Sequence, residues 1–97
     1  MIRMIVKSAP GPIMRARTVD ISAADFTDDD DEYGFLVDVS KAGDLVVIPS
    51  GSSAEMEFAG LDAGGFPNVA GVPILCRTVK ASAAIGSVNV GYVKLPS

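Results

Sequence analysis

The sequence predicts an all-β fold, a small antiparallel β-sandwich or barrel of about seven strands with an extended N-terminal arm. Ten glycines and six prolines punctuate its 97 residues at the spacing of short strands and their turns. Valine and isoleucine dominate the apolar stretches, and β-branched side chains favour a pleated surface. A chain this short has room for one core. We therefore expect an arm at residues 1–12 and a single β domain at residues 13–97.

The N-terminal residues alternate in part, as in a strand with one apolar face. Ile2, Met4 and Val6 fall on one side, and Arg3 and Lys7 fall on the other. Residues 8–12 follow with two prolines, which donate no backbone hydrogen bond, so they form a stiff hinge. Residues 13–21 then form a strand that faces inward through its last apolar positions. Residues 22–25 resemble a helix capping box and predict a single helical turn.

Residues 27–32 read TDDDDE, a run of carboxylates that disfavours both strand and helix interior. Calcium takes oxygen ligands from neighbouring carboxylates, so this run is a candidate calcium loop. The ligand spacing and the turn glycine of an EF-hand are missing from it. A solvated acidic loop is the preferred interpretation.

The middle of the chain has the clearest strand pattern. Residues 33–39 place Phe35, Val37 and Val39 on one face, and a tight connection at 41–44 leads to a returning strand at 45–48. Residues 54–58 alternate strictly between apolar and acidic side chains, which predicts a half-buried strand. The three strands together predict a meander.

A long connection at residues 60–71 contains four glycines and Phe66. Phe66 either contacts a neighbouring subunit or folds back over the end of the core, and the pattern favours neither. Strands are expected next at residues 72–80 and 87–95, the second with Val88, Val90 and Tyr92 on one face.

The charges are sorted along the chain, although the net charge is only −4. Residues 1–19 hold four bases and no acid, residues 20–62 hold all twelve acids and one base, and residues 63–97 hold three bases and no acid. Either the basic ends lie beside the acidic middle within the fold, or the basic N-terminal part docks on an acidic partner. Exposed ion pairs contribute only about 0–1 kcal/mol each, so the sorting is not required for folding.

The composition argues against several functions. Histidine is absent, and it is the usual general base and the partner of serine and cysteine nucleophiles, so we expect no enzyme and no cofactor. The lone Cys76 lies in an apolar run, which indicates a small buried hydrophobe. We expect no nucleic-acid binding and no membrane segment. Arg3 and Lys7 interrupt any signal-peptide core, so we expect synthesis in the cytoplasm.

Three segments resemble the small head-spike base proteins of gene transfer agents and related tailed phages. They are GFLVDVSKAGDLVVIPSGSSAEMEF, GVPILCRTVKAS and the terminal SVNVGYV. Ala42, Gly43 and Asp44 match the family's turn, and residues 77–80 match its basic strand end. The resemblance implies a virion protein on the capsid exterior that binds the major capsid protein as a homo-oligomer. It is either a pentameric spike base at vertices, with a spike fibre protein above it, or a cement trimer between capsomers.

The expected partner-binding residues lie in the basic N-terminal part and in the long connection. They are Ile2, Arg3, Met4, Ile5, Val6, Lys7, Arg15, Arg17 and Phe66. Strand addition by an arm is a common recognition mode. The alternative function is a non-catalytic carbohydrate- or ligand-binding β module, although sugar sites favour exposed aromatics and this chain has no tryptophan.

Overall fold

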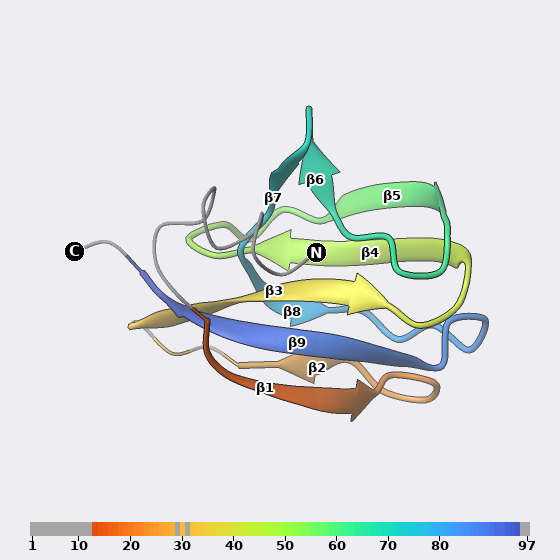
Figure 1. Cartoon of the computed structure of the whole chain (residues 1–97), viewed down its shortest axis with the longest axis horizontal. Helices are drawn as coiled ribbons and strands as arrows, with labels where there is room; N and C mark the ends of the chain where they lie inside the picture. The colour runs from red at the N-terminus through yellow and green to blue at the C-terminus, as the bar shows by residue number, and fades with distance from the viewer. Residues whose placement is uncertain (1–12, 29, 31, 96–97) are drawn as a thin grey trace.

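The computed structural model describes residues 13–28, 30 and 32–95, and this part of the chain is all-β with no helix (Figure 1). The predicted arm at residues 1–12 lies outside the described residues. The strands are β1 (Ile13–Asp20), β2 (Phe26–Thr27), β3 (Tyr33–Val39), β4 (Gly43–Pro49), β5 (Met56–Leu61), β6 (Asn68–Val69), β7 (Val72–Pro73), β8 (Cys76–Val79) and β9 (Ser87–Lys94).

Seven of these strands form one antiparallel sheet that bends into two layers. Its order is β1-β9-β3-β8-β4-β5, and β2 also pairs with β8. The bend falls between β3 and β8, which are joined by the single pair Phe35↔Cys76. In Figure 1, β2 and β8 lie behind β9 and β3. β1, β9 and β3 therefore make one layer, and β2, β8, β4 and β5 make the other.

The core between the layers is built from alternating side chains, as the strand patterns predict. Phe35, Val37 and Val39 of β3 are buried there with Val88 and Val90 of β9. β1 supplies Val19 from its far end, and Ile21 follows directly after that strand. Leu45 and Val47 of β4 close the core from the other layer.

The predicted meander is wrong in one pairing. β4 pairs with β5 as expected, but β8 rather than β3 lies on its other side. Cys76, Thr78 and Val79 of β8 are all buried, so this short strand takes a central place in the sheet. The connection at residues 40–42 therefore crosses from one layer to the other instead of turning back along β3.

The predicted helical turn at residues 22–25 is also wrong. The Asp20 carboxylate accepts hydrogen bonds from the Ser22 hydroxyl (2.7 Å) and the Ser22 backbone N–H (2.8 Å), and these bonds lower the pKa of Asp20. An aspartate that binds the backbone two residues ahead makes a turn that competes with a helix. The chain then enters β2, a two-residue strand that the sequence pattern did not indicate.

The long connection and the strand after it differ from their predicted form. A separate hairpin, β6–β7, occupies residues 68–73, and β8 begins only at Cys76. Pro73 ends β7 because a proline nitrogen donates no ladder hydrogen bond. The predicted strand at residues 72–80 is therefore divided between the hairpin and the main sheet.

Candidate interaction surfaces

The described residues place three of the predicted contact residues on or near β1, and residues 2–7 lie outside the described part. Arg15 and Arg17 are exposed on β1. Their side chains share the core-facing side of that strand with Val19, since strand residues two apart point the same way. Phe66 is half-buried on the other face, where it lines a hollow together with Ala16. β1 therefore separates Phe66 from the two arginines.

The two arginines of β1 lie over aromatic rings. The Arg15 guanidinium carbon is 4.3 Å from the centre of the Tyr92 ring, and that of Arg17 is 5.4 Å from the centre of the Phe26 ring. Cation–π contacts of this kind contribute about 0.5–1 kcal/mol at exposed sites. Phe26 belongs to β2 in the other layer, so Arg17 spans the open side of the sandwich. We call β1, with Arg15 and Arg17, the basic edge.

A small cavity opens beside the basic edge. It has a volume of about 180 Å³ and is lined by Arg15, Asp30, Tyr33 and Tyr92. The Tyr92 hydroxyl is buried without a hydrogen-bond partner among the described residues. Burial, and secondly the nearby carboxylate of Asp28, raise the pKa of Tyr92. A cation, an aromatic ring and a carboxylate around one cavity form a lining that suits a small polar ligand.

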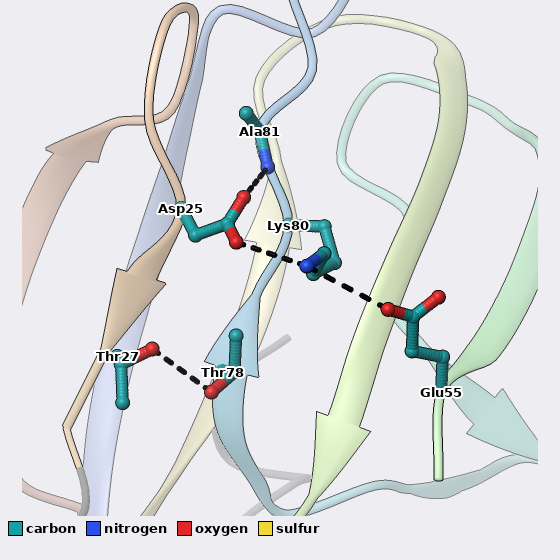
Figure 2. Close-up of polar contacts among 6 residues, drawn as sticks. All are labelled: Asp25, Thr27, Glu55, Thr78, Lys80 and Ala81. Carbon is teal, nitrogen blue, oxygen red and sulfur yellow. Dashed lines mark hydrogen bonds and ion pairs between the residues drawn. The ribbon is translucent and has the colours of Figure 1, made fainter.

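The opposite end of the sheet is acidic. Glu55 precedes β5 directly, and Glu57 lies within it, both exposed and two residues apart. The Lys80 ammonium, at the end of β8, lies 3.6 Å from the Glu55 carboxylate and 3.0 Å from that of Asp25 (Figure 2). Glu57 makes no ion pair with any described residue. We call β5, with Glu55 and Glu57, the acidic edge.

The contacts of Lys80 test whether the basic ends of the chain pair with its acidic middle within the fold or dock on an acidic partner. Lys80 belongs to the basic C-terminal third, and both of its partners belong to the acidic middle. The charge of this lysine is therefore compensated within the fold by acidic residues of the middle segment. Neither Arg15 nor Arg17 has a carboxylate within ion-pair distance in the described part of the chain.

We expect the contacts around Lys80 to make the stability pH-dependent in acid. A hydrogen bond from the Ala81 N–H (2.8 Å), and secondly the Lys80 ammonium, lower the pKa of Asp25 (Figure 2). A carboxylate with a lowered folded-state pKa stabilises above its unfolded pKa of about 3.9, and this stability is lost as the pH falls through the folded value. Asp25 in turn raises the pKa of Lys80 in the folded state. The stability that the Lys80 ammonium contributes is therefore present at all pH values below its unfolded pKa of about 10.4, and it is lost only as the pH rises through the higher folded-state pKa.

Urea midpoints measured between pH 2 and pH 6 test this pH dependence. Asp25→Asn should lower the midpoint at pH 6 and flatten its decline toward pH 2. The matched control is Glu57→Gln, which removes a carboxylate without an ion pair among the described residues. Equal declines in wild type and Asp25→Asn would contradict the assignment.

The β6–β7 hairpin rises away from the body of the protein (Figure 1). Val69 and Val72 pair across it and expose 54% and 57% of their surface, so two large apolar side chains lie side by side in solvent. No charged residue occurs between Asp62 and Arg77. Asn68 braces the hairpin, because its side chain donates to the Phe66 carbonyl (2.8 Å) and accepts from the Gly71 N–H (3.0 Å). Sequence reasoning missed this surface, because Ala-Gly is not among the dipeptides that signal a type I′ hairpin turn.

The turn of this hairpin holds a strained residue, which predicts a stabilising substitution. Ala70 has φ of 53° and Gly71 has φ of 85°, so both central residues are left-handed, as in a type I′ turn. A side chain with a Cβ costs about 1–2 kcal/mol in that conformation, whereas asparagine is favoured there. Ala70→Asn should raise the free energy of unfolding by about 1 kcal/mol, measured by urea denaturation. Ala83→Asn, at an exposed site without positive φ, should not.

The hollow that Phe66 lines lies on the outer face of the β1-β9-β3 layer. Its volume is about 80 Å³, with Leu36 and Gly91 on one side and Pro67 and Ile74 on the other. Phe66 is only half-buried there. Phe66 therefore lies against the outer face of the sheet and not over the end of the core, and its contact with a neighbouring subunit stays a prediction.

Cys76 lies in the core, where its thiol donates to the Ile74 carbonyl at 3.4 Å. Burial raises the pKa of Cys76 to about 12, so the reactive thiolate is scarce at neutral pH. Among the described residues, no group of three His, Cys, Asp or Glu side chains could hold a metal ion. The acidic run is described only in part, since residues 29 and 31 lie outside the described residues. No described segment forms a helix long and apolar enough to cross a membrane.

Comparison with known proteins adds no relative: no protein-family model, curated protein or solved structure matches this chain. The fold and its surfaces therefore define the class, a small antiparallel β-sandwich with a projecting hairpin and two oppositely charged sheet edges.

Proposed function

We propose that this chain is a non-catalytic virion structural protein that decorates or cements the exterior of a tailed-phage-like capsid. The main support is the β6–β7 hairpin, which presents Val69 and Val72 to solvent from a charge-free segment. An apolar protrusion without charge suits burial against another protein, because no unpaired charge is desolvated there. The major capsid protein is the proposed partner, and the resemblance to head-spike base proteins motivates this choice.

A second contact is proposed for residues 1–12, which precede the basic edge and carry Arg3 and Lys7. Ile2, Met4 and Val6 alternate with polar positions, so this segment can add a strand to a capsid protein.

Cosedimentation with capsids tests the proposal. The probe is a capsid assembled from the major capsid protein encoded nearest to this chain's gene. The full chain should sediment with it. Val69→Ser with Val72→Ser, and separately removal of residues 1–12, should each weaken binding about tenfold or more, and Ala83→Ser should bind like wild type. Failure of the full chain to bind would overturn the proposal, and undiminished binding by the truncated chain would overturn the role of the arm.

The cavity beside the basic edge favours a second candidate, a carbohydrate- or ligand-binding module. Tyr33 offers a ring, and Arg15 and Asp30 offer polar groups that can orient a ligand. A glycan array probed with the full chain and with Tyr33→Ala distinguishes the two candidates. Binding that is lost in Tyr33→Ala would support the module, and a blank array would count against it.

A further inference from the structure

We infer that neighbouring copies of this chain pair edge to edge, with the basic edge of one copy against the acidic edge of the next. This inference rests on the proposed function, because the resemblance that motivates it also implies a homo-oligomer, and it identifies the surfaces that such an oligomer would use. β1 and β5 are the two ends of the main sheet. Within the described residues, each pairs with only one strand, β1 with β9 and β5 with β4. An open strand edge is a template for pairing with another chain.

The charges of the two edges are complementary in sign and in spacing. Arg15 and Arg17 lie two residues apart on β1, and Glu55 and Glu57 lie two residues apart at β5. Side chains two apart in a strand share a face, so both pairs can meet at once in either a parallel or an antiparallel pairing. Complementary charges across a contact steer association and fix its register. The charge sorting along the chain thereby gains a structural explanation.

The directions of these side chains also agree. Arg15 and Arg17 point to the core-facing side of their layer, whereas Glu57 points away from the core, opposite Met56 and Phe58. The two layers of a sandwich face each other. The inner side of the layer that contains β1 therefore points in the same direction as the outer side of the layer that contains β5. Copies related by a rotation keep this direction when its axis lies near the layer normal but is tilted enough to bring the two edges, which belong to different layers, to the same height. Such a rotation brings the arginines and the glutamates to one face of the joined sheet.

The groups concerned can accept a partner. A guanidinium has five N–H donors, and a cation–π contact with one ring does not occupy all of them, so donors remain for a carboxylate. Glu57 makes no ion pair with a described residue, and Glu55 is the more distant of the two partners of Lys80. A contact between two different surfaces is heterologous, and it closes into a ring where the rotation permits. A ring of three or five copies would leave no open edge.

Charge reversal in the full chain tests this pairing by light scattering after size-exclusion chromatography. Arg17→Glu and Glu57→Arg should each weaken self-association about tenfold or more, because like charges then face each other. The double variant Arg17→Glu with Glu57→Arg should restore the wild-type oligomer. Lys41→Glu reverses an exposed charge outside both edges and should have no effect.

Hydrogen exchange gives a readout that does not depend on substitutions. Backbone amides of β1 and β5 in the wild-type chain should gain protection as the concentration rises, and those of β6–β7 should not. A monomeric wild-type chain, or a double variant as weak as the singles, would overturn the pairing. Capsid cosedimentation is scored separately. A monomer that binds capsids would overturn the edge pairing alone, and an oligomer that fails to bind them would overturn the proposed function alone.

Discussion

Replacement of Phe35 by alanine is expected to lower the free energy of unfolding by about 3–5 kcal/mol, the cost of deleting a buried phenylalanine. Phe35 is fully buried where the sheet bends, and it forms the single pair that joins β3 to β8. Its ring centre lies 5.3 Å from that of Phe26 and 6.0 Å from that of Tyr92, and both contacts are tilted. Such contacts contribute beyond the buried area, so the substitution removes support from both layers.

Urea denaturation followed by circular dichroism measures this effect. Val72→Ala is the matched control, because it also shortens an apolar side chain but at a largely exposed site. It should change the free energy of unfolding by about 0.5 kcal/mol or less. A loss below about 2 kcal/mol in Phe35→Ala would mean that the neighbouring rings collapse into the space and that the bend does not depend on this residue.

In the strands that the sequence predicts well, apolar and polar residues alternate, and the apolar side chains are buried in the core. Residues 33–39 match β3 as predicted, and the inward faces of β1 and β9 are confirmed by the burial of Val19, Val88 and Val90. Alternation identifies these strands because each has one face in the core. β3 is in addition covered on its other face, since Leu36 is nearly buried there. The second face of β3 carries Gly34, Leu36 and Asp38, and this mixed pattern does not indicate that the face is partly covered.

The local sequence pattern could not predict the order of the strands in the sheet. A tight connection at residues 41–44 is compatible with a hairpin and equally with a crossing between layers, and only the position of β8 decides between them. The candidate interaction surfaces depend on the same non-local information. The sequence shows that Arg17 and Glu57 belong to segments of opposite charge. That these segments are the two ends of one sheet follows only from the pairing of all the strands between them.

The other large expected effect lies in the turn after β5. Gly65→Val is expected to lower the free energy of unfolding by about 2–4 kcal/mol, from overpacking and from a lost hydrogen bond. A Cβ at Gly65 would lie 2.8 Å from the Asp62 carbonyl oxygen and 3.4 Å from the Asp62 nitrogen. Both are backbone atoms, so the turn itself must shift. The turn also pairs with Val39, which donates to the Gly65 carbonyl (2.9 Å) and accepts from the Gly64 N–H (2.7 Å).

Gly64→Asn separates this steric effect from the general cost of replacing a glycine. Gly64 has φ of +83° but open space around its Cβ position, and asparagine tolerates that conformation, so the cost should be about 1 kcal/mol or less. Urea midpoints of the two variants give the comparison. Hydrogen exchange should show lost protection at Val39 in Gly65→Val alone. Because this turn carries the chain from the acidic edge to the β6–β7 hairpin, Gly65→Val should weaken capsid binding more than Gly64→Asn does. Equal effects would show that the turn does not fix the hairpin.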